Sequence, residues 1–153
     1  YEFLASIPSI GNYKYKRHLV RVLLAGRAAE QLTVGIEDMS VTSARSDLRH
    51  ATDIAKDLIG RYGISPTMED ESTAGSIVLL KIGSDVSVTE KHRIENAGRL
   101  FLSRQYDVVL DQLRAHRVFL EAIADRLVKQ KILDKGHLKS MAIEYGVLNE
   151  SAA

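Results

Sequence analysis

Apolar residues that recur at spacings of three and four constrain the fold of this chain more than any other feature. The pattern runs over residues 14–32 and again over residues 48–62, and it has the period of an α-helix with one buried face. Gly63 and then Pro66 predict where the second of these helices ends. We therefore predict two amphipathic helices joined by a connector at residues 35–42.

The middle of the first predicted helix, "AGRAAE", is made of small residues that allow another helix to approach closely. Glycine is costly inside a helix, so Gly26 is expected to have a packing reason. The first helix is therefore predicted to be central in the fold.

The segment 64–88 lacks the helical spacing of the two preceding segments. "EDESTAG" is polar, and "SIVLLKIG", at residues 76–83, is an apolar run that fits a short strand or a buried loop. We expect an irregular segment with little strand.

A long helical region is predicted after this segment. "SVTE" at residues 87–90 has the pattern of a capping box, and apolar residues continue to about Leu133. We predict two antiparallel helices, broken around "RAHR", because a break lets both apolar faces be buried. A last short helix is expected at residues 136–145, closed by Gly146.

These elements predict an all-α fold, a bundle of about four to five helices in a single domain at residues 1–153. Hydrophobic residues make up 45% and charged residues 27%, as in ordinary soluble globular proteins. Lys and Arg number 21 against 20 Asp and Glu, which argues against nucleic acid as a partner. There is no cysteine, so any metal must be bound by His, Asp or Glu.

The longest apolar runs are far shorter than the roughly 20 residues of a membrane-spanning helix. The chain begins at Tyr1 with no signal-peptide pattern, and we expect it to be part of a longer protein. Phosphate-binding loops, nucleophile elbows and H-E-x-x-H zinc helices are not found in the sequence. No complete catalytic set is present.

Asp47, in "SDLRHAT", allows three interpretations. A carboxylate in the first turn of a helix is favoured by the free N–H groups and the helix dipole. Asp47 is also a candidate metal ligand, alone or with His50, which lies one turn further on. Two ligands do not hold Zn²⁺, which weighs against an isolated Asp47/His50 site.

Glu30 lies on the packed side of the first predicted helix, and a buried carboxylate needs a partner. One interpretation is an ion pair with an arginine, such as Arg27 or one across the core. The other is that Glu30 orients a metal-bound group without binding the metal itself. The four histidines other than His50 lie among charged residues and are expected on solvated helix faces: His18, His92, His116 and His137.

"VLLAGRAAEQL" and then "SDLRHATDIAKDLIGRYGIS" resemble the peptidase domain of the FtsH family, hexameric membrane-anchored AAA+ zinc proteases. That family shows a G-G-R-x-A-E-E helix and then a T-G-A-x-N-D-[LI]-x-x-A-T helix that ends near Y-G-[MF]-S. The segment from "SVTEKHRIENAGRLF" to "KGHL" is similar to the family's closing helices. The resemblance covers residues 13–145 in the right order, so it is much more specific than any one motif.

The resemblance implies a role for Asp47, because the aspartate of the family's N-D-[LI] stretch is the third protein ligand of the catalytic zinc. The other two ligands are the histidines of H-E-x-x-H, whose glutamate acts as the base in the attack of water on a peptide carbonyl. Glu30 matches the first glutamate of A-E-E, which strengthens its orienting role. His50 falls where the family specifies no residue.

The sequence departs from the family pattern at four positions beside the implied ligand. Ser43 stands for a glycine, Arg45 for a small residue, Ser46 for asparagine and Gln31 for the second glutamate. These departures suit a divergent subfamily, or a helical assembly module that has lost catalysis. An unrelated four-helix module is a third hypothesis.

The resemblance also sets expectations for the parent protein, the longer protein of which this chain is expected to be a part. Residues 13–63 would form the metal-ligand and core helices, 64–88 the irregular segment and 89–146 the C-terminal helices. The parent would be a hexamer, anchored by membrane helices with this domain on the cytoplasmic side or its organellar equivalent. It would use zinc, and ATP with Mg²⁺, to degrade unfolded or membrane proteins. Because H-E-x-x-H is absent, this chain is expected to be inactive alone and without a bound cofactor. The chain itself is expected to be soluble.

Overall fold

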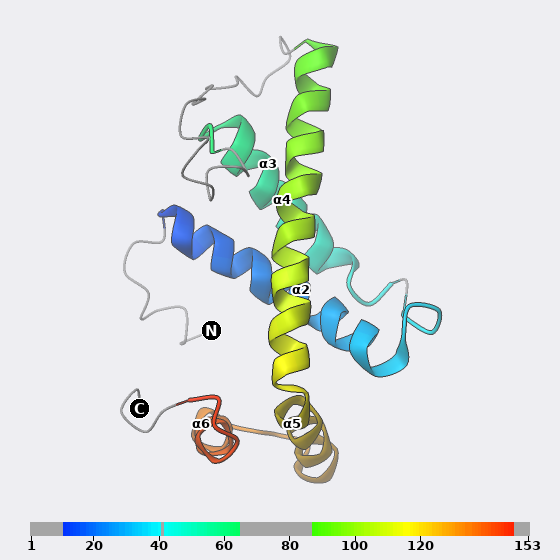
Figure 1. The fold of residues 1–153 in the computed structure, drawn as a ribbon, viewed down its shortest axis with the longest axis vertical. Coiled ribbons are helices and arrows are strands. Elements are labelled where there is room, and N and C mark those ends of the chain that lie inside the picture. Colours follow the sequence, from blue (N-terminus) through cyan, green and yellow to red (C-terminus); the bar gives the residue numbers. More distant parts are fainter. Residues whose placement is uncertain (1–10, 41, 65–86, 149–153) are drawn as a thin grey trace. The chain divides into compact units, whose positions relative to one another are not determined.

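A computed structural model describes residues 11–40, 42–64 and 87–148. The described residues form five helices and no strand, which confirms the predicted all-α class (Figure 1). The predicted strand-like segment at 76–83 lies outside the described residues. The helices are α2 (Tyr13–Val34), α3 (Arg45–Gly60), α4 (Val88–Ala115), α5 (Arg117–Gln130) and α6 (Lys135–Glu144).

The chain divides into two compact units, Tyr1–Leu110 and Asp111–Ala153. The first contains α2, α3 and α4 up to Leu110, and the second contains α5 and α6. The single-domain organisation of residues 1–153 stays a prediction.

Local signals in the sequence account for where the helices begin. The Asn12 side chain accepts a hydrogen bond from the N–H of Tyr15 at 2.8 Å, so it caps α2. The Ser87 hydroxyl accepts one from the N–H of Glu90 at 3.2 Å, so the serine of the predicted capping box caps α4.

The predicted helix ends also agree with the structure. Gly63 and Gly146 have positive φ angles of 64° and 69°, which glycine adopts without strain, and they follow α3 and α6. The long C-terminal helical region is interrupted at His116, within the predicted "RAHR" break.

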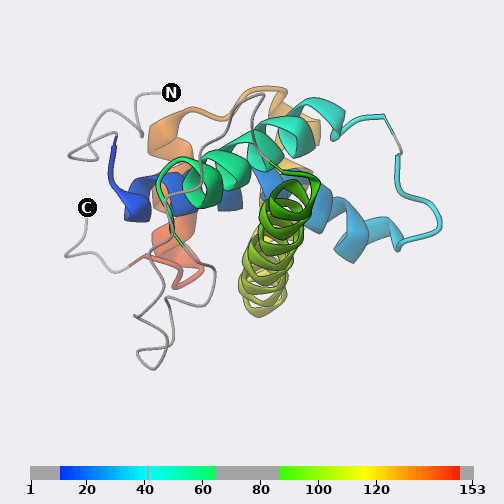
Figure 2. The ribbon, with the colours of Figure 1, turned by 90° about the horizontal axis from the view of Figure 1, so that it is seen from above.

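Figures 1 and 2 show α2 and α3 running side by side in opposite directions, with α4 crossing them. Their facing sides build the core of the first unit because the apolar residues of each helix lie on one stripe. The buried cluster consists of Val20, Leu24, Ala51, Ile54, Ala55, Leu58, Ile59, Ile94 and Phe101.

One expectation about packing is wrong. A Cβ atom added at Gly26 meets nothing within 4 Å, so the described structure gives this glycine no packing reason. The fully buried small residue of this stretch is Ala28, two positions later on the other side of the helix.

We expect Gly26→Ala to stabilise the first unit by about 0.5–1 kcal/mol, because alanine loses less backbone entropy in a helix interior. Chemical denaturation of this chain, followed by circular dichroism, measures the change. A lower unfolding midpoint would show that the Gly26 position is constrained after all.

Two polar contacts join α4 to α2. The Nε of Arg21 donates to Oε1 of Gln105 at 2.7 Å, and the Tyr106 hydroxyl donates to Oε1 of Gln31 at 2.7 Å. Gln105 is only 1% exposed. Burial raises the pKa of Tyr106, against the opposing charge of Arg27, so the phenol stays protonated and remains a donor at neutral pH.

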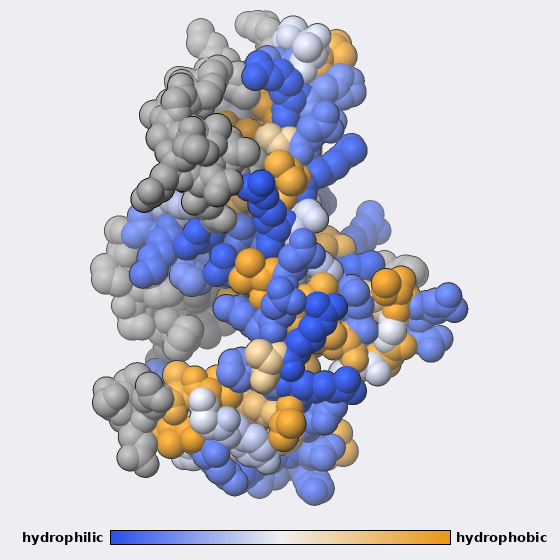
Figure 3. Space-filling view, in the orientation of Figure 1, coloured by the Kyte–Doolittle hydropathy of each residue, from blue (hydrophilic) through white to orange (hydrophobic). Residues whose placement is uncertain are grey.

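In the second unit, α6 supplies the buried residues Met141 and Ala142, and α5 has none. The Asp134 side chain accepts from the N–H of His137 at 2.8 Å, and this hydrogen bond holds the pKa of Asp134 below its usual value. Apolar residues of this unit lie at the surface, among them Val128 and Ile132. Figure 3 shows apolar surface, in orange, interspersed with polar surface on the face that it displays. None of the described helices is long and apolar enough to span a bilayer.

Candidate metal-ligand residue at the start of α3

Asp47 is the third residue of α3 and lies in its first turn. The preceding N-cap residue is Ala44, which offers no side-chain cap, although its carbonyl accepts from the N–H of Leu48 at 2.9 Å. The Asp47 side chain is exposed. Its carboxylate therefore lies where free N–H groups and the helix dipole favour a negative charge, as the helix-start interpretation predicts.

A zinc site needs three protein ligands even when its fourth position is open. Within residues 11–40, 42–64 and 87–148, no three His, Cys, Asp or Glu side chains lie close enough together to hold a metal ion. Asp47 and His50 are both exposed and lie one turn apart. An exposed carboxylate suits zinc as one oxygen ligand, so Asp47 fits the group, but the described residues do not complete the set.

The Glu30 carboxylate contacts the connector between α2 and α3. Its Oε1 accepts from the backbone N–H of Ser40 at 2.7 Å, and its Oε2 accepts from the Ser43 hydroxyl at 3.4 Å. The expected ion pair with an arginine such as Arg27 is not found in the described part of the chain. The sequence correctly indicated that Glu30 needs a partner, but that partner is the connector.

The connector is itself closed by hydrogen bonds. The Ser40 hydroxyl oxygen accepts from the N–H of Ser43 at 3.2 Å and, more weakly, from that of Thr42 at 3.4 Å. The N–H of Arg45 then donates to the Thr42 carbonyl at 3.3 Å, immediately before α3. This short turn leads from the residues held by Glu30 directly to the helix that carries Asp47.

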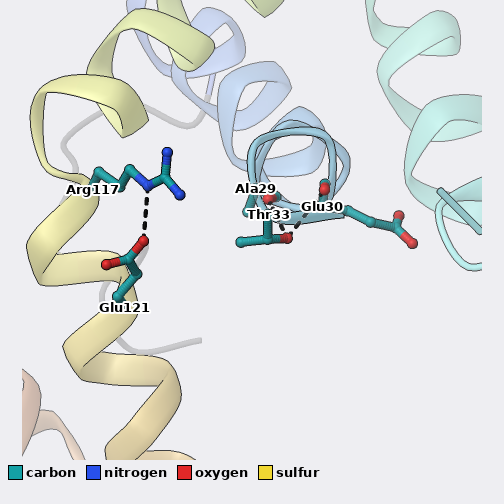
Figure 4. Close-up of polar contacts among 5 residues, drawn as sticks. All are labelled: Ala29, Glu30, Thr33, Arg117 and Glu121. Atoms are coloured by element: carbon teal, nitrogen blue, oxygen red, sulfur yellow. Dashed lines mark hydrogen bonds and ion pairs between the residues drawn. The ribbon is translucent and has the colours of Figure 1, made fainter. Parts of the chain in front are cut away.

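Figure 4 shows that the Glu30 side chain extends away from the end of α2. The nearby Thr33 hydroxyl donates to the backbone carbonyls of Ala29 at 2.9 Å and Glu30 at 3.1 Å. Thr33 therefore uses the backbone of Glu30 and leaves its carboxylate to the connector. The figure also draws a separate ion pair of α5, Arg117 to Glu121 at 2.8 Å.

All five histidines are exposed. His18, His92 and His137 lie on solvated helix faces, as expected, whereas His116 lies in the break between α4 and α5. His18 has a pKa below its ordinary value because partial desolvation disfavours the charged ring, and nearby positive charges add to the effect. Those charges belong to Arg21, Arg17 and Lys14.

The sequence analysis missed Ser40 and the buried Gln105. No pattern in the sequence marks Ser40, because its backbone N–H is the donor and any residue except proline has one. Gln105 had a signal: it lies four residues from both Phe101 and Val109, in the middle of an apolar stripe.

The fold and the site define an all-α domain in which the helix start after a short connector presents an exposed carboxylate. The profile of peptidase family M41 matches residues 5–141. This chain belongs to peptidase family M41, and the resemblance to FtsH proteases is confirmed.

Relatives of the chain carry the name ATP-dependent zinc metalloprotease FtsH. The protein from Trieres chinensis is 29% identical over 139 residues, which cover 85% of this chain and 21% of the relative. The protein from Burkholderia pseudomallei is 34% identical over 124 residues, covering 76% and 18%. FTSH 8, chloroplastic, from Arabidopsis thaliana is 27% identical over 127 residues, covering 80% and 18%. The chain thus spans about one fifth of the length of these relatives.

Proposed function

We propose that this chain forms the C-terminal part of the peptidase domain of an ATP-dependent zinc metalloprotease, in which Asp47 is one of the zinc ligands. Family membership and the names of the relatives support the reaction class. The observation that carries the role of Asp47 is its exposed carboxylate in the first turn of α3, at the position of the motif's aspartate.

When bound, zinc supplies a Lewis acid that polarises a peptide carbonyl and lowers the pKa of a water molecule. In that chemistry, the role of this chain is to hold the Asp47 carboxylate in place. A carboxylate is an oxygen ligand that suits zinc, and α3 carries it in its first turn. The two histidines and the base belong to the H-E-x-x-H motif, which this sequence does not contain. We therefore propose that the chain alone has no peptidase activity.

The proposal extends to the parent protein. It would act on unfolded or membrane proteins, assemble as a hexamer, use ATP and Mg²⁺ in an AAA+ module, and be anchored by membrane helices with the peptidase domain on the cytoplasmic side or its organellar equivalent. These properties rest on the family alone.

The test is Asp47→Ala in the full-length protein. We expect the zinc content to fall from about one ion per subunit toward zero, because two histidine ligands are too few to retain the ion, and casein hydrolysis to be lost with it. Zinc is measured by mass spectrometry after dialysis. The matched control is Asp53→Ala, which removes another exposed carboxylate from α3. Unchanged zinc and activity in Asp47→Ala would refute the ligand role.

A second candidate is a non-catalytic assembly module. Two residues that differ from the family pattern make scaffold contacts: Gln31 accepts from Tyr106, and Ser43 donates to Glu30. Such contacts would serve a helical module without a metal. A full-length wild-type protein that lacks paired histidines and purifies without zinc would support this candidate, and one ion per subunit would refute it.

A further inference from the structure

We infer that Glu30 is a positioning residue that acts on Asp47 through the connector, and that it does so as a hydrogen-bond acceptor. The connector was predicted at residues 35–42; between the observed ends of α2 and α3 it comprises residues 35–44. This inference rests on the proposed function for its effect on zinc, but its structural part concerns this chain alone.

The geometry of the carboxylate is the first argument. Its two oxygens have separate partners three residues apart in the connector, the Ser40 N–H at 2.7 Å and the Ser43 hydroxyl at 3.4 Å. The contact with the N–H is short, as expected when an ionised acceptor meets a backbone donor. Glu30 is half-buried, so water replaces this contact less easily than at an exposed site.

The path from Glu30 to Asp47 is the second argument. The Ser40 hydroxyl accepts from the N–H of Ser43 and closes the turn, and Ala44 is then the N-cap residue of α3. Asp47 is the fourth residue after Ser43, and the last three of these four residues are helical. The rise and turn per residue are fixed once the chain is helical, so the position of the turn sets where the Asp47 carboxylate lies.

The third argument is the lack of another side-chain anchor at this helix start. Ala44 is the N-cap residue and gives no side-chain hydrogen bond to α3. Helix starts without a capping side chain fray more readily. Among the described residues, the Glu30 carboxylate restrains from α2 the turn that precedes this N-cap residue, through Ser40 and Ser43.

This mechanism differs from the one in which the negative charge of Glu30 orients a metal-bound group. Glu30→Gln separates the two, because the amide keeps an oxygen for the Ser40 N–H and loses the charge. An acceptor role predicts that Glu30→Gln behaves almost as wild type. A charge role predicts that it behaves as Glu30→Ala.

The first experiment measures amide hydrogen exchange at Ser40 in this chain. We expect Glu30→Ala to speed the exchange at least tenfold, and Glu30→Gln to change it little. The matched control is Glu37→Ala, which removes an exposed carboxylate from the same connector. Circular dichroism checks that α2 and α3 persist; if Glu30→Ala unfolds, Ser43→Ala, which removes the hydroxyl that contacts Glu30 and keeps the Cβ atom, must still speed exchange. Exchange that is unchanged in a folded Glu30→Ala would overturn the inference.

The second experiment measures zinc affinity in the full-length protein by chelator competition. Groups that orient a ligand are typically worth 10–100-fold in affinity, so we expect a loss of that size in Glu30→Ala and rescue in Glu30→Gln. Equal losses in both variants would overturn the acceptor role. A wild-type protein that binds no zinc would refute the proposed function, and the exchange experiment would then decide the structural part by itself.

Discussion

Replacing Phe101 with alanine is expected to lower the free energy of unfolding of the first unit by about 3–5 kcal/mol. Phe101 is 3% exposed and belongs to the cluster that α2, α3 and α4 build together. The substitution removes a ring at the point where α4 meets both other helices, so it costs transfer energy and leaves a cavity. A small domain has only about 5–15 kcal/mol of stability, and the loss would take up much of it.

Denaturant titration of this chain, followed by circular dichroism, tests the prediction. The control is Leu100→Ala, the neighbouring residue, which is 44% exposed and should change stability by less than about 0.5 kcal/mol. Equal losses in the two variants would mean that α4 is not packed on α2 and α3 through Phe101.

Much of the fold could be predicted because its determinants are local. The three-and-four spacing predicted α2 and α3, and glycines at positive φ marked where α3 and α6 end. The Ser87 cap of α4 could also be predicted, because a cap depends on residues within one turn. The break at His116 lies within the segment where the sequence predicted it.

Contacts between helices could be predicted less well. One of the two interpretations of Glu30 paired it with an arginine, since a charge suggests an opposite charge, but its shortest hydrogen bond is with a backbone N–H. Backbone donors carry no sequence signature. The prediction that Gly26 packs against another helix failed for a related reason. A small residue permits close approach, but the sequence does not show whether a neighbour is there.

The prediction of Asp47 as a metal ligand depended on the resemblance to a family more than on the pattern of residues in this sequence. The position of Asp47 in the first turn of α3 was predictable from helix signals alone. Those signals are the same for a helix-start carboxylate and for a metal ligand, so only the family motif favours the second. No spacing within this sequence supplies the other ligands.

Gln105 is the one polar residue among the described residues that is fully buried. It lies between Phe101 and Val109 on the apolar stripe of α4. Its amide oxygen accepts from Nε of Arg21, which fixes α4 against α2 in one register. Buried polar contacts of this kind specify an arrangement that apolar packing alone leaves loose.

Gln105→Leu is therefore expected to destabilise the first unit by about 1–3 kcal/mol, despite the greater hydrophobicity of leucine, because the half-buried Arg21 Nε–H loses a short hydrogen bond. The measurement is the unfolding free energy of this chain in denaturant. The control is Gln112→Leu, at an exposed position of α4, where the change should stay within about 0.5 kcal/mol. If Gln105→Leu proves as stable as wild type, apolar packing alone sets how α4 lies on α2, and the bond to Arg21 adds no net stability.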